Sequence, residues 1–137
     1  MVRRIAHIGV ATRSIASAAE IYEALGVTVG PAEEVEDQQV RVALIEVGES
    51  AIELLEATDP ASPIARFIEK RGEGIHHLAF EVDDIEKHLE LLRSRGVELI
   101  DTVSRKGADG AVVAFIHPRG AGGVLIELCQ RSRDGDA

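Results

Sequence analysis

This sequence has little of several residue types, and each shortage excludes a class of protein. Its single cysteine, Cys129, cannot form an internal disulfide, so nothing calls for an oxidising compartment. Tryptophan is absent and aromatic residues make up 3% of the chain, too few for binding nucleic-acid bases by stacking. No apolar run reaches membrane-spanning length, and residues 1–4 lead into a strand pattern without an apolar leader. We therefore expect a cytoplasmic protein with no membrane partner.

Basic residues are also scarce relative to acidic ones. The 15 Lys and Arg residues against 24 Asp and Glu residues give a net charge of −9. A nucleic-acid partner would favour a basic face, so we expect none. What the chain does have is apolar content: 45% of its 137 residues are hydrophobic, enough for the core of one compact domain.

The most informative feature is an internal repeat. Two short stretches of the first half return in the second: 4–10 as 74–80, and 52–55 as 126–129. Each stretch carries one residue that can bind a metal, His7 and Glu53 in the first copy and His77 and Glu127 in the second. Chance rarely places a histidine and a glutamate at matching positions of two repeats. The repeat therefore predicts two half-sites, each with one histidine and one glutamate.

The pattern of apolar residues predicts the order β-α-β-β-β in each half. In the first half we expect a strand at 3–10, a helix between Ser14 and Gly26, and strands opening at 26–27 and lying at 42–45 and 51–55. In the second half we expect a strand at 74–80, a helix between Asp84 and Gly96, and strands opening at 96–97 and lying at 113–116 and 124–129. Ser14 and Asp84 are residue types that cap helix N-termini.

A single module of this kind cannot bury both faces of its sheet, so the two copies should pair. The predicted class is therefore α+β, with two paired βαβββ modules forming a curved sheet around one metal site. We place the single domain at 1–137, with module 1 at about 1–57, a linker helix at about 58–73 and module 2 at about 74–130. The polar tail at 131–137 should be frayed.

Strand alternation predicts that the four polar residues share one face. Neighbouring residues of a strand point to opposite sides, so His7 shares its side with Gly9, and His77 shares its side with Ala79. Glu53 and Glu127 each lie between two aliphatic residues that would face the helices. The small neighbours leave room for a ligand beside each imidazole.

The charges of these residues favour a bound cation. A single strand histidine or glutamate is more often structural than functional, but two buried carboxylates that converge without a partner would repel each other. A divalent metal ion removes that conflict. Mixed nitrogen and oxygen ligands suit Co, Mn, Ni, Fe or Zn, whereas Ca and Mg prefer oxygen alone. We therefore predict a divalent metal cofactor held by His7, Glu53, His77 and Glu127.

These residues resemble a known family. The paired βαβββ halves with their His…Glu…His…Glu order are similar to the vicinal oxygen chelate, or glyoxalase-type, superfamily. More narrowly, the chain resembles the methylmalonyl-CoA epimerases of that superfamily. The stretches that carry this resemblance are 5–11, 52–56, 62–85, 115–119 and 122–128, which together span nearly the whole chain apart from the tail.

The resemblance implies an isomerase that interconverts (R)- and (S)-methylmalonyl-CoA by metal-assisted removal and return of the α-proton. It implies a CoA thioester substrate, a place in propionate metabolism and a homodimer. It also implies that Glu127 is the first candidate for the acid/base residue. Some relatives carry a second Glu where this chain has Val42, so here Glu53 or Glu46 would act on the other face.

Two other functions use the same scaffold. A glyoxalase-type lyase or isomerase would use the same four ligands on a hemithioacetal, and only the substrate pocket would differ. A metal-free small-molecule binding protein would lack the ligand set, which is complete here. His117 lies at the mouth of the last hairpin, where it is a candidate substrate-binding residue, although a turn histidine is more often structural.

Overall fold

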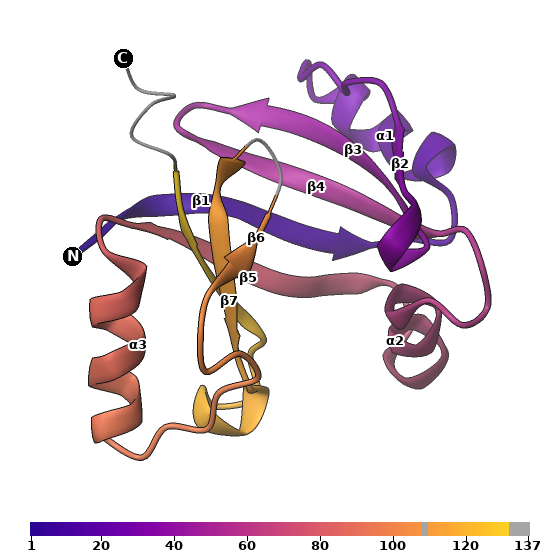
Figure 1. Cartoon of the computed structure of the whole chain (residues 1–137). Coiled ribbons are helices and arrows are strands. Elements are labelled where there is room, and N and C mark those ends of the chain that lie inside the picture. The colour runs from indigo at the N-terminus through magenta and orange to yellow at the C-terminus, as the bar shows by residue number, and fades with distance from the viewer. Residues whose placement is uncertain (108–109, 132–137) are drawn as a thin grey trace. The chain divides into compact units, whose positions relative to one another are not determined.

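The computed structural model describes residues 1–107 and 110–131 (Figure 1). The chain divides into two compact units, described separately below. The N-terminal unit is His7–His76, and the C-terminal unit is Met1–Ala6 together with the chain from His77 onward. Apart from its first residue, the predicted frayed tail lies outside the described residues. Within the described residues, no helix has the length and apolar character needed to cross a membrane.

The N-terminal unit holds the first βαβββ module and the linker helix. Its elements are the second part of β1 (Val2–Ala11), α1 (Ile15–Ala24), β2 (Glu33–Val35), the short 3-10 helix η1 (Glu36–Gln38), β3 (Val40–Val47), β4 (Ser50–Ala57) and α2 (Pro63–Arg71). The strands lie in the order β2-β3-β4-β1. Strand β1 runs parallel to β4, whereas β3 is antiparallel to both β2 and β4.

The C-terminal unit repeats this arrangement. Its elements are the main part of β5 (Gly74–Val82), α3 (Ile85–Ser94), β6 (Arg105–Lys106), β7 (Val112–Ile116), the 3-10 helix η3 (Pro118–Gly120) and β8 (Ile126–Gln130). The strands lie in the order β5-β8-β7-β6, with β5 parallel to β8 and β7 antiparallel to its neighbours. The predicted α+β class with two βαβββ modules is thus confirmed.

Both predicted helix starts are confirmed by their caps. The Ser14 hydroxyl accepts a hydrogen bond from the backbone N–H of Ser17, and the Asp84 carboxylate accepts one from the N–H of Lys87. Each cap satisfies an N–H that has no partner inside its helix. The linker helix α2 spans Pro63–Arg71, within the 58–73 segment, and Ser62 caps its start.

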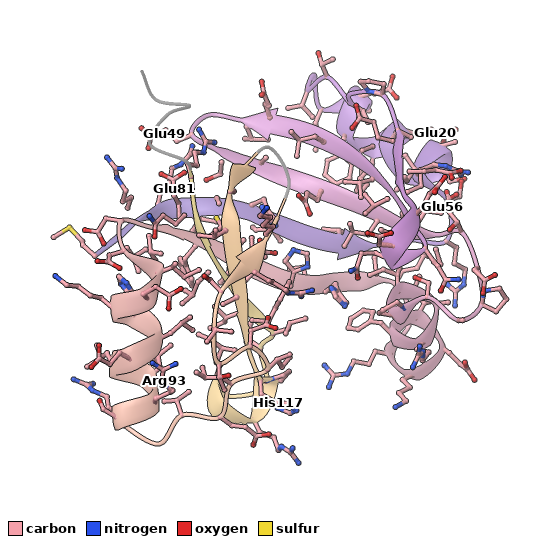
Figure 2. The ribbon with its side chains drawn as sticks, in the orientation of Figure 1. Glu20, Glu49, Glu56, Glu81, Arg93 and His117 are labelled. Atoms are coloured by element: carbon pink, nitrogen blue, oxygen red, sulfur yellow. The ribbon has the colours of Figure 1, made fainter. Side chains whose placement is uncertain are left out.

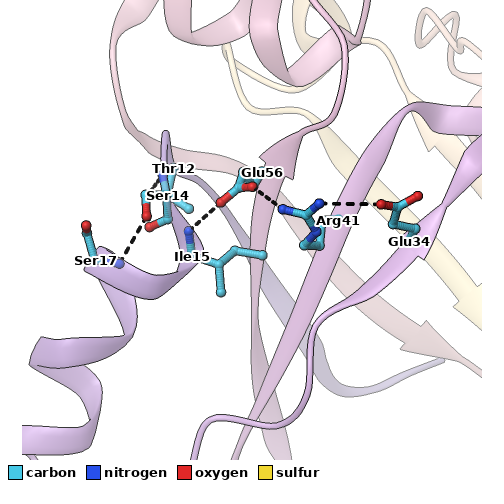
Figure 3. Close-up of polar contacts among 7 residues, drawn as sticks. All are labelled: Thr12, Ser14, Ile15, Ser17, Glu34, Arg41 and Glu56. Carbon is cyan, nitrogen blue, oxygen red and sulfur yellow. Dashed lines mark hydrogen bonds and ion pairs between the residues drawn. The ribbon is translucent and has the colours of Figure 1, made fainter.

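A second contact, not predicted, ties each helix to its own sheet. The Glu56 carboxylate of β4 accepts the N–H of Ile15 at 2.7 Å, and it also pairs with Arg41 of β3 at 2.6 Å (Figure 3). At the equivalent place in the C-terminal unit, the amide oxygen of Gln130 accepts the N–H of Ile85 at 2.8 Å. In both modules the strand that carries the candidate glutamate, Glu53 or Glu127, therefore also anchors the start of the helix.

The helix-facing side of each sheet is apolar, as predicted. In the N-terminal unit the cluster under α1 contains Ile15, Ala43, Ile45 and Leu54, with Val10 and Ile52 packed against it. In the C-terminal unit the cluster under α3 contains Val82, Ile85, Leu89, Ala114, Ile116 and Leu128. These residues alternate along their strands with the polar candidates, so burying the apolar side turns the histidines and glutamates to the other face.

The ligand-facing side of the N-terminal unit has an apolar end that the sequence analysis did not anticipate. Ala11, Val40, Leu55 and Ile64 form a third buried cluster, joined by Val42, Ala57, Phe67 and Ile68. Ile64, Phe67 and Ile68 come from α2, so the linker helix covers this end of the sheet. Val42 belongs to this apolar cluster.

The strand that follows each module's helix is shorter and later than predicted. Instead of a strand from 26–27 or 96–97, the chain makes one bridge per module, Val29 with Ile45 and Leu99 with Ile116. In the first module Pro31 has no N–H for a ladder, and a Cβ on Gly30 would lie 3.0 Å from the carbonyl oxygen of Leu44. In the second, the carboxylate of Asp101 accepts the N–H of Phe115, so a side chain replaces the strand partner.

Candidate metal centre

The first His–Glu pair is built by the parallel pairing of β1 and β4. This register sets Gly9 directly opposite Glu53. His7 lies two residues before Gly9, so its ring is on the same face as the carboxylate. The two side chains meet with Nε2 of His7 3.4 Å from Oε1 of Glu53. Gly9, opposite the carboxylate, adds no side chain to this face.

The second pair repeats this geometry on β5 and β8. The register sets Ala79 opposite Glu127, as Gly9 stands opposite Glu53 in the first module. Nε2 of His77 lies 3.5 Å from Oε1 of Glu127. The sequence-predicted partners are therefore brought together within each module, one imidazole with one carboxylate. Whether all four residues serve one ion is taken up as a proposal below.

The spacing inside each pair fits two ligands of one cation better than a direct ion pair. A charge-assisted hydrogen bond would hold N and O at about 2.7–2.9 Å. Two ligands about 2.1 Å from a metal ion, in tetrahedral geometry, are about 3.4 Å apart. The measured 3.4 and 3.5 Å match the second value. Of the described residues, those that could hold a metal ion include His7, His77 and Glu127.

The second pair is the more buried of the two. The side chains of His77 and Glu127 are 7% and 11% exposed, against 15% and 24% for His7 and Glu53. A carboxylate withdrawn from water to this degree needs a compensating charge, because burying it unpaired is strongly unfavourable. Of the two pairs, the second is therefore the one more withdrawn from solvent.

Phe115 forms a wall beside the second pair. It lies directly opposite Glu127 in the β7–β8 ladder, and its ring meets the His77 ring edge to face at 6.2 Å between centroids. The guanidinium carbon of Arg105 lies 5.4 Å from the Phe115 ring centroid on the strand beyond. The equivalent place beside Glu53 is taken by Leu44, which is exposed. The two half-sites thus share a backbone plan and differ in what stands next to the carboxylate.

Glu81 is a buried acid on the ligand-facing side that the sequence analysis missed. It follows Ala79 on β5 and forms ion pairs with Arg4 at 3.1 Å and Arg131 at 3.0 Å. Its cross-strand neighbour is Cys129, whose pKa is raised to about 11, chiefly by burial and then by the nearby carboxylates of Glu127 and Glu81. Alternation along β5 places Glu81 on the His77 face, so the signal was present in the sequence.

His117 is placed as a turn residue. It follows β7, at the start of η3 (Figure 2). Its Nδ1 accepts the backbone N–H of Arg119 at 3.0 Å, and its Nε2 lies 3.8 Å from the carboxylate of Glu98. Arg119 also pairs with Glu98 at 2.8 Å, a contact that lowers the pKa of this carboxyl group. The ring is therefore held by local contacts, and its role toward a substrate stays a prediction.

Val42 and the acid/base candidate Glu46 both lie on β3, in different surroundings. Val42 lies opposite Leu55 within the apolar cluster under α2. Glu46 lies two residues beyond Leu44, opposite Ala51, and is exposed. Glu46 shares the face of Glu53, so it stays a candidate for proton exchange, although nothing in its surroundings withdraws it from water.

Comparison with known proteins places this geometry in a family. The family model of the Glyoxalase/Bleomycin resistance protein/Dioxygenase superfamily matches residues 6–115. The chain is 42% identical over 132 residues to the uncharacterized protein YqjC of Bacillus subtilis, covering 96% of this chain and 94% of that protein. It is 37% identical to the ethylmalonyl-CoA/methylmalonyl-CoA epimerase of Cereibacter sphaeroides, covering 95% and 99%.

Solved structures agree with the sequence matches. The structure of a hypothetical protein, BH1468 from Bacillus halodurans, superimposes with a TM-score of 0.89 at 44% identity, covering 95% of each chain. A substituted form of the Streptomyces coelicolor methylmalonyl-CoA epimerase, in complex with 2-nitronate-propionyl-CoA, gives a TM-score of 0.87 at 34% identity, covering 97% of each chain. With its two His–Glu pairs on duplicated βαβββ modules, this chain belongs to the Glyoxalase/Bleomycin resistance protein/Dioxygenase superfamily.

Proposed function

We propose that the protein is a metal-dependent epimerase that interconverts (R)- and (S)-methylmalonyl-CoA. The observation that carries the proposal is the duplicated His–Glu pair, with the same register and nearly the same spacing in both modules. The identity to named methylmalonyl-CoA epimerases, over nearly the full chain, supports the choice of reaction. One of these relatives was solved with a CoA thioester analogue, which supports a CoA thioester as the substrate.

The proposed metal ligands are His7, Glu53, His77 and Glu127. Two neutral imidazoles and two carboxylates neutralise a divalent ion, and this donor set suits Co, Mn, Ni, Fe or Zn. When bound, such an ion would act as a Lewis acid that stabilises negative charge developing on the thioester oxygen. The spacing within each pair is the structural support for this assignment.

The chemical step requires a base next to the α-carbon. The hydrogen to be removed lies between a thioester and a carboxylate, so its loss leaves an electron pair delocalised onto the thioester carbonyl. We propose that Glu127 accepts this proton, because it is the more withdrawn of the two candidate carboxylates. Return of a proton to the opposite face of the planar enolate completes the inversion, and Glu53 or Glu46 is the proposed donor there.

The surroundings of Glu127 suit proton transfer. Ala79, directly opposite, has no side chain beyond its methyl group, so the substrate can approach the carboxylate. Phe115 on the other side excludes water, which strengthens electrostatic interactions at the reacting atoms. A positioned carboxylate of this kind contributes roughly 10²- to 10⁴-fold to the rate.

The decisive experiment is α-proton exchange in D₂O. The protein, stripped of metal and then supplied with Co²⁺, Mn²⁺, Ni²⁺, Fe²⁺ or Zn²⁺ in turn, should incorporate deuterium at the α-carbon of methylmalonyl-CoA. Nuclear magnetic resonance measures the exchange directly. A parallel reaction with a glutathione hemithioacetal tests the glyoxalase-type alternative. Exchange with none of the ions, or turnover of the hemithioacetal alone, would overturn the proposal.

We also propose a homodimer located in the cytoplasm. The homodimer is what the resemblance implies, and the single cysteine, which cannot form an internal disulfide, calls for no oxidising compartment. Analytical ultracentrifugation of the purified protein tests the first, and a mass matching a monomer at micromolar concentration would contradict it. Fractionation of the source cells tests the second.

A further inference from the structure

Arg105 lies on the ligand-facing side of the C-terminal sheet. The register sets Arg105 opposite Val113, which in turn lies opposite Cys129. Residues directly opposite each other in a ladder share a face, and so do residues two apart on one strand. Arg105 therefore shares its face with Phe115 and Glu127, although it is two strands away from the glutamate.

Its guanidinium is held in place from two sides. Its carbon lies 5.4 Å from the centre of the Phe115 ring, within the range of a cation–π contact. Its Nε lies 3.5 Å from Oδ2 of Asp101, and the same oxygen accepts the backbone N–H of Phe115 at 2.9 Å. One carboxylate thus fixes both the platform and the cation that rests on it. The side chain of Arg105 is nevertheless 50% exposed.

The contacts leave the guanidinium able to take a further anion. A guanidinium has five N–H donors in a planar fork, and Asp101 engages the side of Nε. Among the described residues, Asp101 is its single acidic partner. A planar arginine fork supported on an aromatic ring is well suited to bidentate recognition of a carboxylate or phosphate.

Comparison of the two modules shows that this cation is not part of the repeated scaffold. Val42 and Val113 occupy equivalent positions, and the residue opposite Val42 is Glu33, where Arg105 is opposite Val113. The charge is therefore reversed between the copies, within a chain whose net charge is −9. At this position, the basic residue belongs to the module whose His–Glu pair is more deeply buried.

We propose that Arg105 binds anionic oxygen atoms of the substrate, which are either the free carboxylate of the acyl group or a phosphate of CoA. The inference rests on the proposed function, since it assigns a binding role beside the same Glu127. Phe115 and Asp101 orient the guanidinium, and the substrate supplies the second anion. Arg105 thereby makes the C-terminal module the side on which the anionic part of the thioester is held.

The test compares Arg105→Gln with Lys106→Gln. Lys106 is the other residue of β6 and points to the opposite face, so the control removes the same charge one position away. Arg105→Gln should raise KM for methylmalonyl-CoA in the deuterium-exchange assay about tenfold, the usual order for one charge-assisted hydrogen bond. Lys106→Gln should stay within about twofold of the wild type. Arg105→Lys should restore only part of the loss, because it keeps the charge without the fork.

Calorimetric binding to the Co²⁺-loaded protein identifies the anion. The probes are methylmalonyl-CoA, propionyl-CoA, which lacks the free carboxylate, and methylmalonyl-pantetheine, which lacks the nucleotide phosphates. Loss confined to the two methylmalonyl thioesters assigns Arg105 to the carboxylate. Loss confined to the two CoA thioesters assigns it to a phosphate. Equal loss for all three probes together with a lowered melting temperature shows a structural role and overturns the inference.

The failure of this inference can be told apart from failure of the proposed function. A wild-type protein that exchanges the α-proton, with Arg105→Gln and Lys106→Gln both unchanged in KM and in binding, refutes the role of Arg105 alone. A wild-type protein that exchanges no α-proton refutes the proposed reaction, and the three binding measurements then still decide whether Arg105 holds an anion.

Discussion

The two His–Glu pairs are alike in backbone and different in environment. Each histidine stands two residues before a small residue that faces the glutamate across a parallel ladder, and the N–O distances differ by only 0.1 Å, from 3.4 to 3.5 Å. Around the first pair the neighbouring side chains are aliphatic and partly exposed. Around the second, an aromatic ring and an arginine add an aromatic wall and a positive charge.

This difference shows which part of a duplicated site is constrained. The register and the helix anchors are kept in both copies because they fix where the ligands stand. The residues beside the carboxylates do not affect the backbone plan, so they can diverge. We infer that metal binding is shared by the modules, while proton transfer and anion recognition are concentrated in the C-terminal one.

The largest expected effect separates the two glutamates. Glu127→Gln should reduce deuterium exchange at the α-carbon by roughly 10²- to 10⁴-fold, because it removes the proposed base and keeps an oxygen that can bind the metal. Glu53→Gln also keeps an oxygen that can bind the metal, so a cost near tenfold would assign proton return to Glu46, and a cost as large as that of Glu127→Gln would assign it to Glu53. Metal content measured alongside the exchange rate is the control. Normal exchange in a metal-loaded Glu127→Gln protein would show that Glu127 is not the base, and would contradict the expected difference between the two glutamates.

Metal binding should stabilise the protein through both pairs, with more dependence on the second. At a metal concentration about 100 times Kd, binding contributes about 2.7 kcal/mol to the free energy of unfolding. We expect a chelator to remove this gain, and His77→Ala to weaken metal binding more than His7→Ala because its pair is more buried. Thermal unfolding with and without added Co²⁺ measures the effect. The wild type and His77→Ala, each with and without Co²⁺, give four measurements. Identical melting temperatures in all four would contradict a stabilising metal site.

The hydrophobic cores under α1 and α3 allow the two modules to be compared by their stability alone. Leu54 and Leu128 occupy equivalent positions, are 0% and 4% exposed, and each follows a glutamate ligand. Replacing either by Ala should cost about 2–5 kcal/mol of unfolding free energy, because it leaves a cavity under the helix. Denaturant unfolding monitored by circular dichroism measures both. Costs that differ by several kcal/mol would show that the cores are less alike than the backbones.

Glu56 and Gln130, which each accept the first N–H of a helix, should contribute smaller amounts to the free energy of unfolding. Glu56→Ala removes a carboxylate from the N-terminus of α1 and leaves Arg41 without this partner, so we expect a cost of about 1–2 kcal/mol. Gln130→Ala removes a neutral acceptor from the start of α3 and should cost about 1 kcal/mol. The same denaturant measurement applies. A larger cost for Gln130 would reverse the expected order.

The smallest expected effect on stability concerns Glu73, which binds the segment between β1 and α1. The Glu73 carboxylate accepts hydrogen bonds from the N–H of Arg13 and the hydroxyl of Thr12, and these bonds hold its pKa below the usual 4.5. A lowered pKa stabilises the folded state above about pH 4.5, and the gain is lost as the pH falls through the folded value. Glu73→Gln should therefore lower the melting temperature slightly at neutral pH and not at about pH 2.5. An equal difference at both pH values would indicate a packing effect.

The sequence predicts which histidine meets which glutamate because two independent signals coincide. Alternation sets the face of each side chain, and the repeat sets the partner, so His7, Glu53, His77 and Glu127 are found without a structure. The helix boundaries follow from Ser14 and Asp84 for a similar local reason. Each of these features can be recognised in a short stretch of sequence, either the alternation along one strand or the residue type at one helix start.

What the sequence does not predict depends on contacts between distant segments. The strand after α3 is cut short because Asp101 takes the N–H of Phe115, a contact that apolar periodicity cannot show. Glu81 escapes attention because its counterpart in the first copy is Ala11, so the repeat gives no signal there. Arg105 lies in a strand of two residues, too short to establish a face by alternation.

The division of the chain between the two units has a consequence for how such a protein can arise. Strand β1 begins in the C-terminal unit and passes into the N-terminal unit at His7, and β5 makes the reverse passage at His77. Residues 1–6 therefore complete a module that begins seventy residues later, where Arg4 neutralises Glu81. A free-standing single module would have to borrow this segment from a second copy, as in a domain-swapped dimer. When both modules belong to one chain, the segment is supplied within the molecule. Completing the module then does not depend on protein concentration.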